Sequence, residues 1–264
     1  MQRGPSIDGV DLQGRVVVIT RPAGTAAGLA QQVRKAGGVP LLLPGLAVHG
    51  PADETSARAG LQAALADDLL IFSSPAAVRF AAGLVPLHTH AAVMAVGQGT
   101  AQALRQHGIE SPLVPSRQDS EGVLDHPALR EPAGRRVALI GAPGGRGLLR
   151  EAIAARGAQL REVHVYRRAA PRLDRRHIDA LLQLPHTALV LLSSAEALHN
   201  LGRLLPPPAL ARLCAATAVV SSERLVVAAG EAGFRRIKLA VSALPADLLA
   251  ACGGRFANPG ARAG

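Results

Sequence analysis

Aromatic side chains are almost missing from this chain of 264 residues, which has one tyrosine, four phenylalanines and no tryptophan. Proteins that bind RNA or single-stranded DNA usually stack the bases on aromatic rings. The shortage therefore argues against a nucleic-acid partner, although the formal net charge is +10. It also draws attention to the single tyrosine, Tyr166.

Cysteines and long apolar runs are also scarce. Cys214 and Cys252 lie far apart and lack the CxxC spacing of a zinc site, so we expect neither a metal nor a disulfide framework. No stretch approaches the about 20 consecutive apolar residues of a membrane-spanning helix. The N-terminal sequence shows no apolar segment of a secretion signal. These absences predict a cytoplasmic protein that has no membrane partner.

Lysine is rare among the 29 basic residues, since only Lys35 and Lys238 are lysines and the others are arginines. The planar guanidinium group of arginine pairs well with carboxylate and phosphate oxygens. Two interpretations stay open at this point. The arginines are either a solvated surface that reflects coding bias, or they attract a polyanionic ligand.

Short apolar runs alternate with longer segments of helical period, a pattern typical of an α/β fold with parallel sheets. The length and the 48% apolar fraction are sufficient for two cores, so two domains are expected. Strands are predicted at 15–20, 39–48, 68–72, 91–96, 111–115, 135–140, 160–167, 187–192, 215–220 and 236–241. Helices are predicted at 25–36, 75–83, 99–107, 146–156, 174–184, 194–204, 222–232 and 245–252.

The two halves of the chain form a degenerate tandem repeat. The segment 70–78 resembles 190–198, and 15–20 resembles 136–141, in each case roughly 120 positions further along. Such a repeat predicts two similar lobes with a ligand-binding cleft between them. In open α/β sheets, ligands bind at the carboxyl ends of strands, near the N-termini of helices.

Two serine pairs occupy that position in the repeat. Ser73-Ser74 and Ser193-Ser194 each follow an apolar strand and precede a helix. Helix capping alone explains part of this pattern, and capping is compatible with binding.

Two glycine-containing loops are weaker signals of a ligand-binding site. The segment 97–100 lacks the third glycine of a dinucleotide-binding loop, and 141–147 lacks the ending of a P-loop.

Short motifs follow one another along the chain in this order: Thr20-Arg21-Pro22, Phe72-Ser73-Ser74-Pro75-Ala76-Ala77-Val78, Val96-Gly97 with Thr100-Ala101, Ser120-Glu121-Gly122, Gly145-Arg146 with Leu149, Val165-Tyr166-Arg167, Ser193-Ser194 and Ser221-Ser222-Glu223-Arg224. In this order they resemble the uroporphyrinogen-III synthase family, and the resemblance covers about residues 15–250. Each motif is short, and the ordered set carries the resemblance.

The resemblance implies two flavodoxin-like α/β domains with parallel sheets, joined by a two-stranded antiparallel linker. One domain is discontinuous and combines 1–40 with 171–264. The linker strands are 41–49 and 163–170, and the inserted domain is 50–162. Each repeat would thus contribute its first βα unit to the other domain, whereas a boundary based on the repeat alone would fall near residue 130.

The resemblance also implies an activity. Members of the family cyclise the linear tetrapyrrole hydroxymethylbilane to uroporphyrinogen III in haem and sirohaem biosynthesis, with inversion of ring D and loss of water. They use neither a metal nor an organic cofactor. Each pyrrole of the substrate carries an acetate and a propionate, which gives the arginine excess a purpose. A monomer is implied, with at most transient contact with the preceding enzyme of the pathway.

The family's site residues can be carried over by position. Tyr166 is expected to donate a proton or hydrogen bond to the departing hydroxyl, because a phenol has an ordinary pKa of about 10 and stays protonated at neutral pH. Without the resemblance, a packed strand aromatic would be the preferred interpretation of this tyrosine. The expected substrate-binding residues are Arg21, Ser73, Ser74, Gly97, Thr100, Glu121, Arg146, Ser193, Ser194, Ser221 and Ser222.

Two other function classes are alternatives to this enzyme. A non-catalytic ligand-binding or regulatory protein could have the same two-lobed fold. The retained tyrosine and serine pairs favour the enzyme over that alternative. The incomplete glycine loops disfavour a nucleotide-dependent oxidoreductase.

Overall fold

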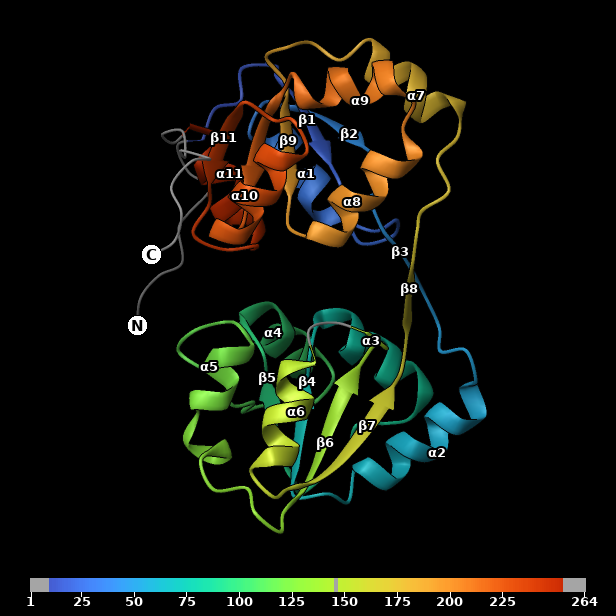
Figure 1. Ribbon diagram of the computed structural model, residues 1–264, viewed down its shortest axis with the longest axis vertical. Coiled ribbons are helices and arrows are strands. Elements are labelled where there is room, and N and C mark those ends of the chain that lie inside the picture. The colour runs from blue at the N-terminus through green and yellow to red at the C-terminus, as the bar shows by residue number, and fades with distance from the viewer. Residues whose placement is uncertain (1–9, 145–146, 254–264) are drawn as a thin grey trace. The chain divides into compact units, whose positions relative to one another are not determined.

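A computed structural model describes residues 10–144 and 147–253 and divides the chain into two compact units (Figure 1). Unit 1 contains the chain up to Ala47 and from Ala169 onward, and unit 2 is Val48–Arg168. Each unit has its own apolar cores. Within the described residues, no helix is both long and apolar enough to cross a lipid bilayer.

Unit 1 is built on a five-stranded parallel sheet. In the order of the sheet its strands are β11 (Arg236–Leu239), β10 (Thr217–Val220), β9 (Leu189–Leu192), β1 (Val16–Ile19) and β2 (Val39–Leu42). Counted from β2 by position along the chain, this is the 2-1-3-4-5 order of flavodoxin-like folds. Its helices are α1 (Ala27–Lys35), α7 (Arg175–Leu182), α8 (Ala195–Leu204), α9 (Pro207–Cys214), α10 (Glu223–Glu231) and α11 (Pro245–Gly253).

The inner strands β1, β9 and β10 of unit 1 are largely buried on both faces, which explains their apolar sequences. Alternate residues point to opposite faces. Val17 packs in a core with Leu29 of α1 and Leu248 of α11. Val18 packs in the other core, which the helices α7 to α10 complete. The sheet is therefore a central layer between two layers of helices.

Unit 2 repeats this design with a four-stranded parallel sheet. In order its strands are β5 (Ala92–Ala95), β4 (Leu69–Phe72), β6 (Arg136–Gly141) and β7 (Gln159–His164). Its helices are α2 (Glu54–Ala64), α3 (Pro75–Leu84), α4 (Gln98–Gln106), α5 (Ser120–Asp125), the 3₁₀ turn η1 (Pro127–Leu129) and α6 (Leu148–Ala155). One core contains residues of α2, α3 and α4, and the other contains residues of α5 and α6.

A two-stranded antiparallel sheet forms where the chain passes from one unit to the other. Its strands are β3 (Ala47–His49) and β8 (Arg167–Ala169). The linker ranges expected from the sequence, 41–49 and 163–170, contain these strands. The same ranges also contain Leu42, which pairs with β1, and His164, which pairs with β6.

The two repeats are interleaved in the sheets. Strands β1 and β2 come from the first repeat but lie beside β9 of the second. Strands β6 and β7 come from the second repeat but lie beside β4 of the first. Figure 1 shows this as blue strands within the orange and red sheet of unit 1. Each unit is therefore assembled from both halves of the chain.

The predicted strand at 111–115 is wrong, because only a single bridge joins Leu113 to Met94. Leu113 donates its N–H to the carbonyl of Val93 at 2.7 Å and accepts from the N–H of Ala95 at 2.8 Å. Proline lies on both sides, at Pro112 and Pro115, and proline has no N–H to continue a ladder. The bridge occupies the place in unit 2 that β11 occupies in unit 1.

The predicted strand at 39–48 is divided into β2 and β3 by Pro44-Gly45. Gly45 donates its N–H to the carbonyl of Thr20 and accepts from Asn200 Nδ2, both at 3.0 Å. A Cβ atom at position 45 would lie 2.7 Å from the Cβ of Ala197 in α8. Glycine is thus required here by close approach to α8.

Gly45→Ala should lower the free energy of unfolding of unit 1 by about 1–3 kcal/mol, because the added methyl group overpacks a filled contact. Chemical denaturation followed by circular dichroism measures the change. Gly202→Ala is the matched control, since Gly202 is in α8 and has no atom within 4 Å of its Cβ position. That control should gain about 0.5–1 kcal/mol from higher helix propensity. A neutral Gly45→Ala would show that α8 can shift without cost.

Candidate active site

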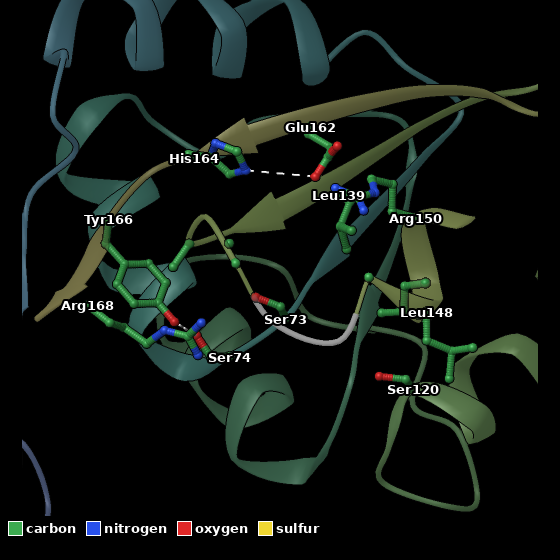
Figure 2. Close-up of a pocket in the computed structure, with 15 residues that line it drawn as sticks. Ser73, Ser74, Ser120, Leu139, Leu148, Arg150, Glu162, His164, Tyr166 and Arg168 are labelled. Carbon is green, nitrogen blue, oxygen red and sulfur yellow. Dashed lines mark hydrogen bonds and ion pairs between the residues drawn. The ribbon is translucent and has the colours of Figure 1, made fainter. Parts of the chain in front are cut away.

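A polar cavity of about 370 Å³ opens at the carboxyl edge of the sheet of unit 2 (Figure 2). Its walls come from the ends of β4, β6 and β7 and from the start of α6. Ligands of parallel α/β sheets bind at such an edge. The residues that line it are Ser73, Ser74, Ser120, Leu139, Gly141, Ala142, Gly144, Gly147, Leu148, Leu149, Arg150, Glu162, His164, Tyr166 and Arg168.

Tyr166 is fixed in the wall of this cavity. The residue is only 5% exposed, and its ring stacks on Phe80 with centroids 5.7 Å apart and planes 11° apart. Its hydroxyl lies 3.1 Å from Ser74 Oγ. The predicted catalytic tyrosine and the predicted binding serine thus contact each other, as Figure 2 shows.

Ser74 connects the tyrosine to the N-terminus of α3. Its Oγ accepts the N–H of Ala77 at 3.1 Å, which caps the helix, and Pro75 occupies the first helical turn without needing an N–H partner. The Ser74 and Tyr166 hydroxyls have two hydrogens between them, and their mutual bond uses one. The pair therefore retains a hydroxyl hydrogen that it can donate to a ligand in the cavity.

Charged side chains that the sequence motifs did not single out also line the cavity. Arg150 comes from the first turns of α6, and Arg168 comes from β8 and donates to the carbonyl of Pro143 at 3.4 Å. His164 Nε2 lies 3.8 Å from Glu162 Oε2. The missed signal was strand alternation, because residues 162, 164 and 166 share one face of an extended segment.

Three predicted binding residues belong to unit 2 but do not line this cavity. Gly97 precedes α4, where Gln118 accepts the N–H of Gln98 at 2.9 Å and would clash with a Cβ at position 97. Thr100 is buried in α4, and Glu121 lies in the first turn of α5. Arg146 is outside the described residues.

The other predicted binding residues belong to unit 1 and follow the carboxyl ends of β9, β10 and β1. Ser194, after Ser193, caps α8 by accepting the N–H of Ala197 at 3.2 Å. Ser222, after Ser221, is the N-cap residue of α10 but makes no capping bond with its side chain. The hydroxyls therefore repeat in unit 1 the position that Ser73-Ser74 occupies in unit 2.

Arg21 has a supporting contact in unit 1. Its Nη2 donates to the carbonyl of Ala243 at 2.5 Å, in the loop after β11. Burial lowers the pKa of the Arg21 guanidinium below its ordinary value, because the charged form loses hydration. The side chain thus connects the ends of β1 and β11 at the carboxyl edge.

Ser74→Ala and Ser194→Ala should each lower the free energy of unfolding by about 1 kcal/mol through loss of a helix cap. We expect Ser74→Ala to lose about 0.5–1.5 kcal/mol more, because the Tyr166 hydroxyl also loses its partner. Denaturant titration of both variants measures the difference. Equal losses would mean that the Ser74–Tyr166 contact adds nothing to stability.

Both units have the same design: hydroxyls and helix N-termini at the carboxyl edge of a parallel sheet, where partial positive charge favours anionic ligands. Unit 2 adds a buried tyrosine whose hydroxyl lies next to a polar cavity. Together the two units define a two-domain α/β protein with hydroxyls and helix N-termini at its sheet edges and a buried tyrosine hydroxyl beside a cavity.

Comparison with known proteins specifies the family. A family model described as "Uroporphyrinogen-III synthase HemD" matches residues 27–250. The uroporphyrinogen-III synthase of Escherichia coli (strain K12) is 31% identical over 237 residues, covering 86% of this chain and 95% of that protein. The Salmonella typhimurium enzyme is 30% identical over 239 residues, with the same coverage. The chain belongs to the uroporphyrinogen-III synthase family, as the ordered motifs predicted.

Solved structures of the family share the fold. A mutant uroporphyrinogen III synthase from the extremely thermophilic bacterium Thermus thermophilus matches with a TM-score of 0.60 and 21% identity, covering 90% of this chain and 96% of that one. The Helicobacter pylori 26695 protein matches with a TM-score of 0.56 and 15% identity over the same shares of both chains. The predicted α/β fold with parallel sheets and a small antiparallel sheet is confirmed.

Proposed function

We propose that this chain cyclises hydroxymethylbilane to uroporphyrinogen III, with inversion of ring D and loss of water, in tetrapyrrole biosynthesis. The family match supports the reaction. The observation that carries the assignment of the site is the Tyr166–Ser74 hydroxyl pair in the wall of a polar cavity. We further propose that the enzyme acts as a cytoplasmic monomer, with at most transient contact with the enzyme that supplies its substrate.

The chemistry defines what the protein has to do. Loss of the hydroxymethyl hydroxyl as water leaves an electrophilic azafulvene, which the substituted carbon of ring D attacks to give a spiro intermediate. That intermediate fragments and closes again with ring D inverted. Spontaneous closure gives the other isomer. The enzyme must therefore assist the departure of water and hold a flexible chain so that the inverting route is faster.

Tyr166 is the donor in this proposal. Its phenol, supported by Ser74, donates a hydrogen bond to the departing hydroxyl and so stabilises the charge that develops on oxygen. Its rigid position follows from burial and from the stacked ring of Phe80. Tyr166 assists the reaction, and part of the rate comes from correct orientation of the substrate.

Carboxylates of the substrate are bound at the carboxyl edges of the sheets. In unit 2 the hydroxyl-bearing residues Ser73 and Ser74 line the cavity, together with Arg150 and Arg168. Further proposed contacts are Gly97 and Thr100 at the start of α4, Glu121 at the start of α5, and Arg146. In unit 1 the proposed contacts are Arg21, Ser193, Ser194, Ser221 and Ser222.

The test is to generate hydroxymethylbilane in situ, add the protein, oxidise the products and separate the uroporphyrin isomers. We expect the type III isomer to dominate. Type I product alone, formed at the rate seen without protein, would contradict the enzyme. Binding of the substrate without any type III product would instead identify a ligand-binding protein with the same fold.

A further inference from the structure

A carboxylate in the cavity of unit 2 needs an explanation. Glu162 is the one acidic residue among the described residues that line it, and the proposed substrate carries a carboxylate on every side chain. An unpaired glutamate there would repel that substrate, since like charges at short distance are unfavourable. Glu162 therefore needs a basic partner within the cavity.

His164 is that partner. Its Nε2 lies 3.8 Å from Glu162 Oε2, and Figure 2 shows the two side chains facing each other above the same strand. The histidine is half-exposed, with 46% of its side chain accessible to solvent. Of the two arginines among the described residues of the cavity, Arg150 lies 3.4 Å from Glu151, and Arg168 contacts the carbonyl of Pro143.

The position of the pair follows from the strand. Residues 162, 164 and 166 alternate with buried Val163 and Val165, so Glu162, His164 and Tyr166 face one cavity. A histidine is the side chain whose ordinary pKa lies closest to neutral pH, which makes it a better proton source there than a phenol. The ionisable groups that share the cavity with His164 are Glu162 and Tyr166, Arg150 from α6, and Arg168 from β8.

The geometry points to His164 as the general acid of the dehydration step, with Glu162 as its positioning residue; this inference rests on the proposed function. The substrate's C–O bond breaks with its electron pair on oxygen, and the imidazolium gives that oxygen a proton from the nitrogen that does not face Glu162. Water leaves, and the pyrrole nitrogen's lone pair forms the new double bond. The proton that ring D releases at the final closure returns to the imidazole.

His164→Gln and Glu162→Gln test the assignment, with wild-type activity established first. We expect His164→Gln to lower kcat for type III formation at least about tenfold, towards the lower end of general-acid effects because Tyr166 remains, and to change KM little. The wild-type kcat should fall as rising pH removes the proton that the general acid donates. That fall should disappear in His164→Gln, and Glu162→Gln should lower kcat with little change in KM.

His107→Gln is the matched control, because His107 ends α4 and lies outside the lining of the cavity. Its kcat and pH profile should equal those of the wild type. An unchanged kcat and pH profile in His164→Gln would overturn the inference. A raised KM with the profile kept would also overturn it and would make His164 a carboxylate-binding residue. Absence of type III product from the wild type would instead contradict the proposed function.

Discussion

Replacing Tyr166 by phenylalanine is expected to slow formation of the type III isomer by about 10²-fold while leaving KM nearly unchanged. The substitution removes only the hydroxyl. The ring that stacks on Phe80 stays, so the wall of the cavity keeps its shape. An effect on kcat without one on KM is typical of an interaction made in the transition state. Initial rates of isomer-resolved product formation measure it.

The control for Tyr166→Phe is a measurement of its stability, which shows whether the variant stays folded. Loss of the Tyr166–Ser74 hydrogen bond should cost about 1 kcal/mol, too little to unfold unit 2 at assay temperature. A thermal melt of the variant checks this. A normal melt with an unchanged rate of type III formation would remove Tyr166 from the mechanism and leave orientation of the substrate as the main contribution.

Phe72→Ala is expected to lower the free energy of unfolding of unit 2 by about 3–5 kcal/mol. Phe72 is 1% exposed at the end of the central strand β4, immediately before Ser73, so the substitution leaves a large cavity beside the site. Tyrosine fluorescence during denaturation measures the effect. The chain has one tyrosine and no tryptophan, and Tyr166 belongs to unit 2, so this signal reports on that unit.

Phe234→Ala is the matched variant in unit 1. Phe234 is 2% exposed and packs in a core that contains residues of unit 1 alone. A loss of similar size should appear in the circular-dichroism transition, while the Tyr166 fluorescence transition should stay at its wild-type position. Equal shifts of both signals in both variants would show instead that the two units unfold as one.

Much of the fold could be predicted from the sequence because local signals agree with tertiary structure. Apolar runs of strand length mark β4, β5 and β6 in the sheet of unit 2. The helix α9 was not predicted, because it begins at Pro207 within a run of three prolines that is more typical of a loop. Because proline is also tolerated in the first turn of a helix, the composition of this segment does not distinguish a helix from a loop.

The candidate site was predicted only where a motif exists. Tyr166 and Ser74 stand in separate motifs, and the structure brings their hydroxyls within 3.1 Å of each other. Arg168 was missed, because it reaches the cavity from β8 and nothing in its own segment distinguishes it from the many surface arginines. Which residues share a cavity depends on the packing of strands distant in sequence, and such packing leaves no local pattern.

The interleaving of the repeats affects how this protein can be divided for experiments. Cleavage near residue 130 would separate the two homologous halves, but each fragment would then contain strands of two different sheets. Neither fragment could complete a sheet by itself, and the native sheets would form again only by mutual complementation of the two fragments. The segment 48–168, in contrast, includes every strand of its parallel sheet in one continuous stretch. It is therefore the piece to express for isolating the tyrosine cavity from the rest of the protein.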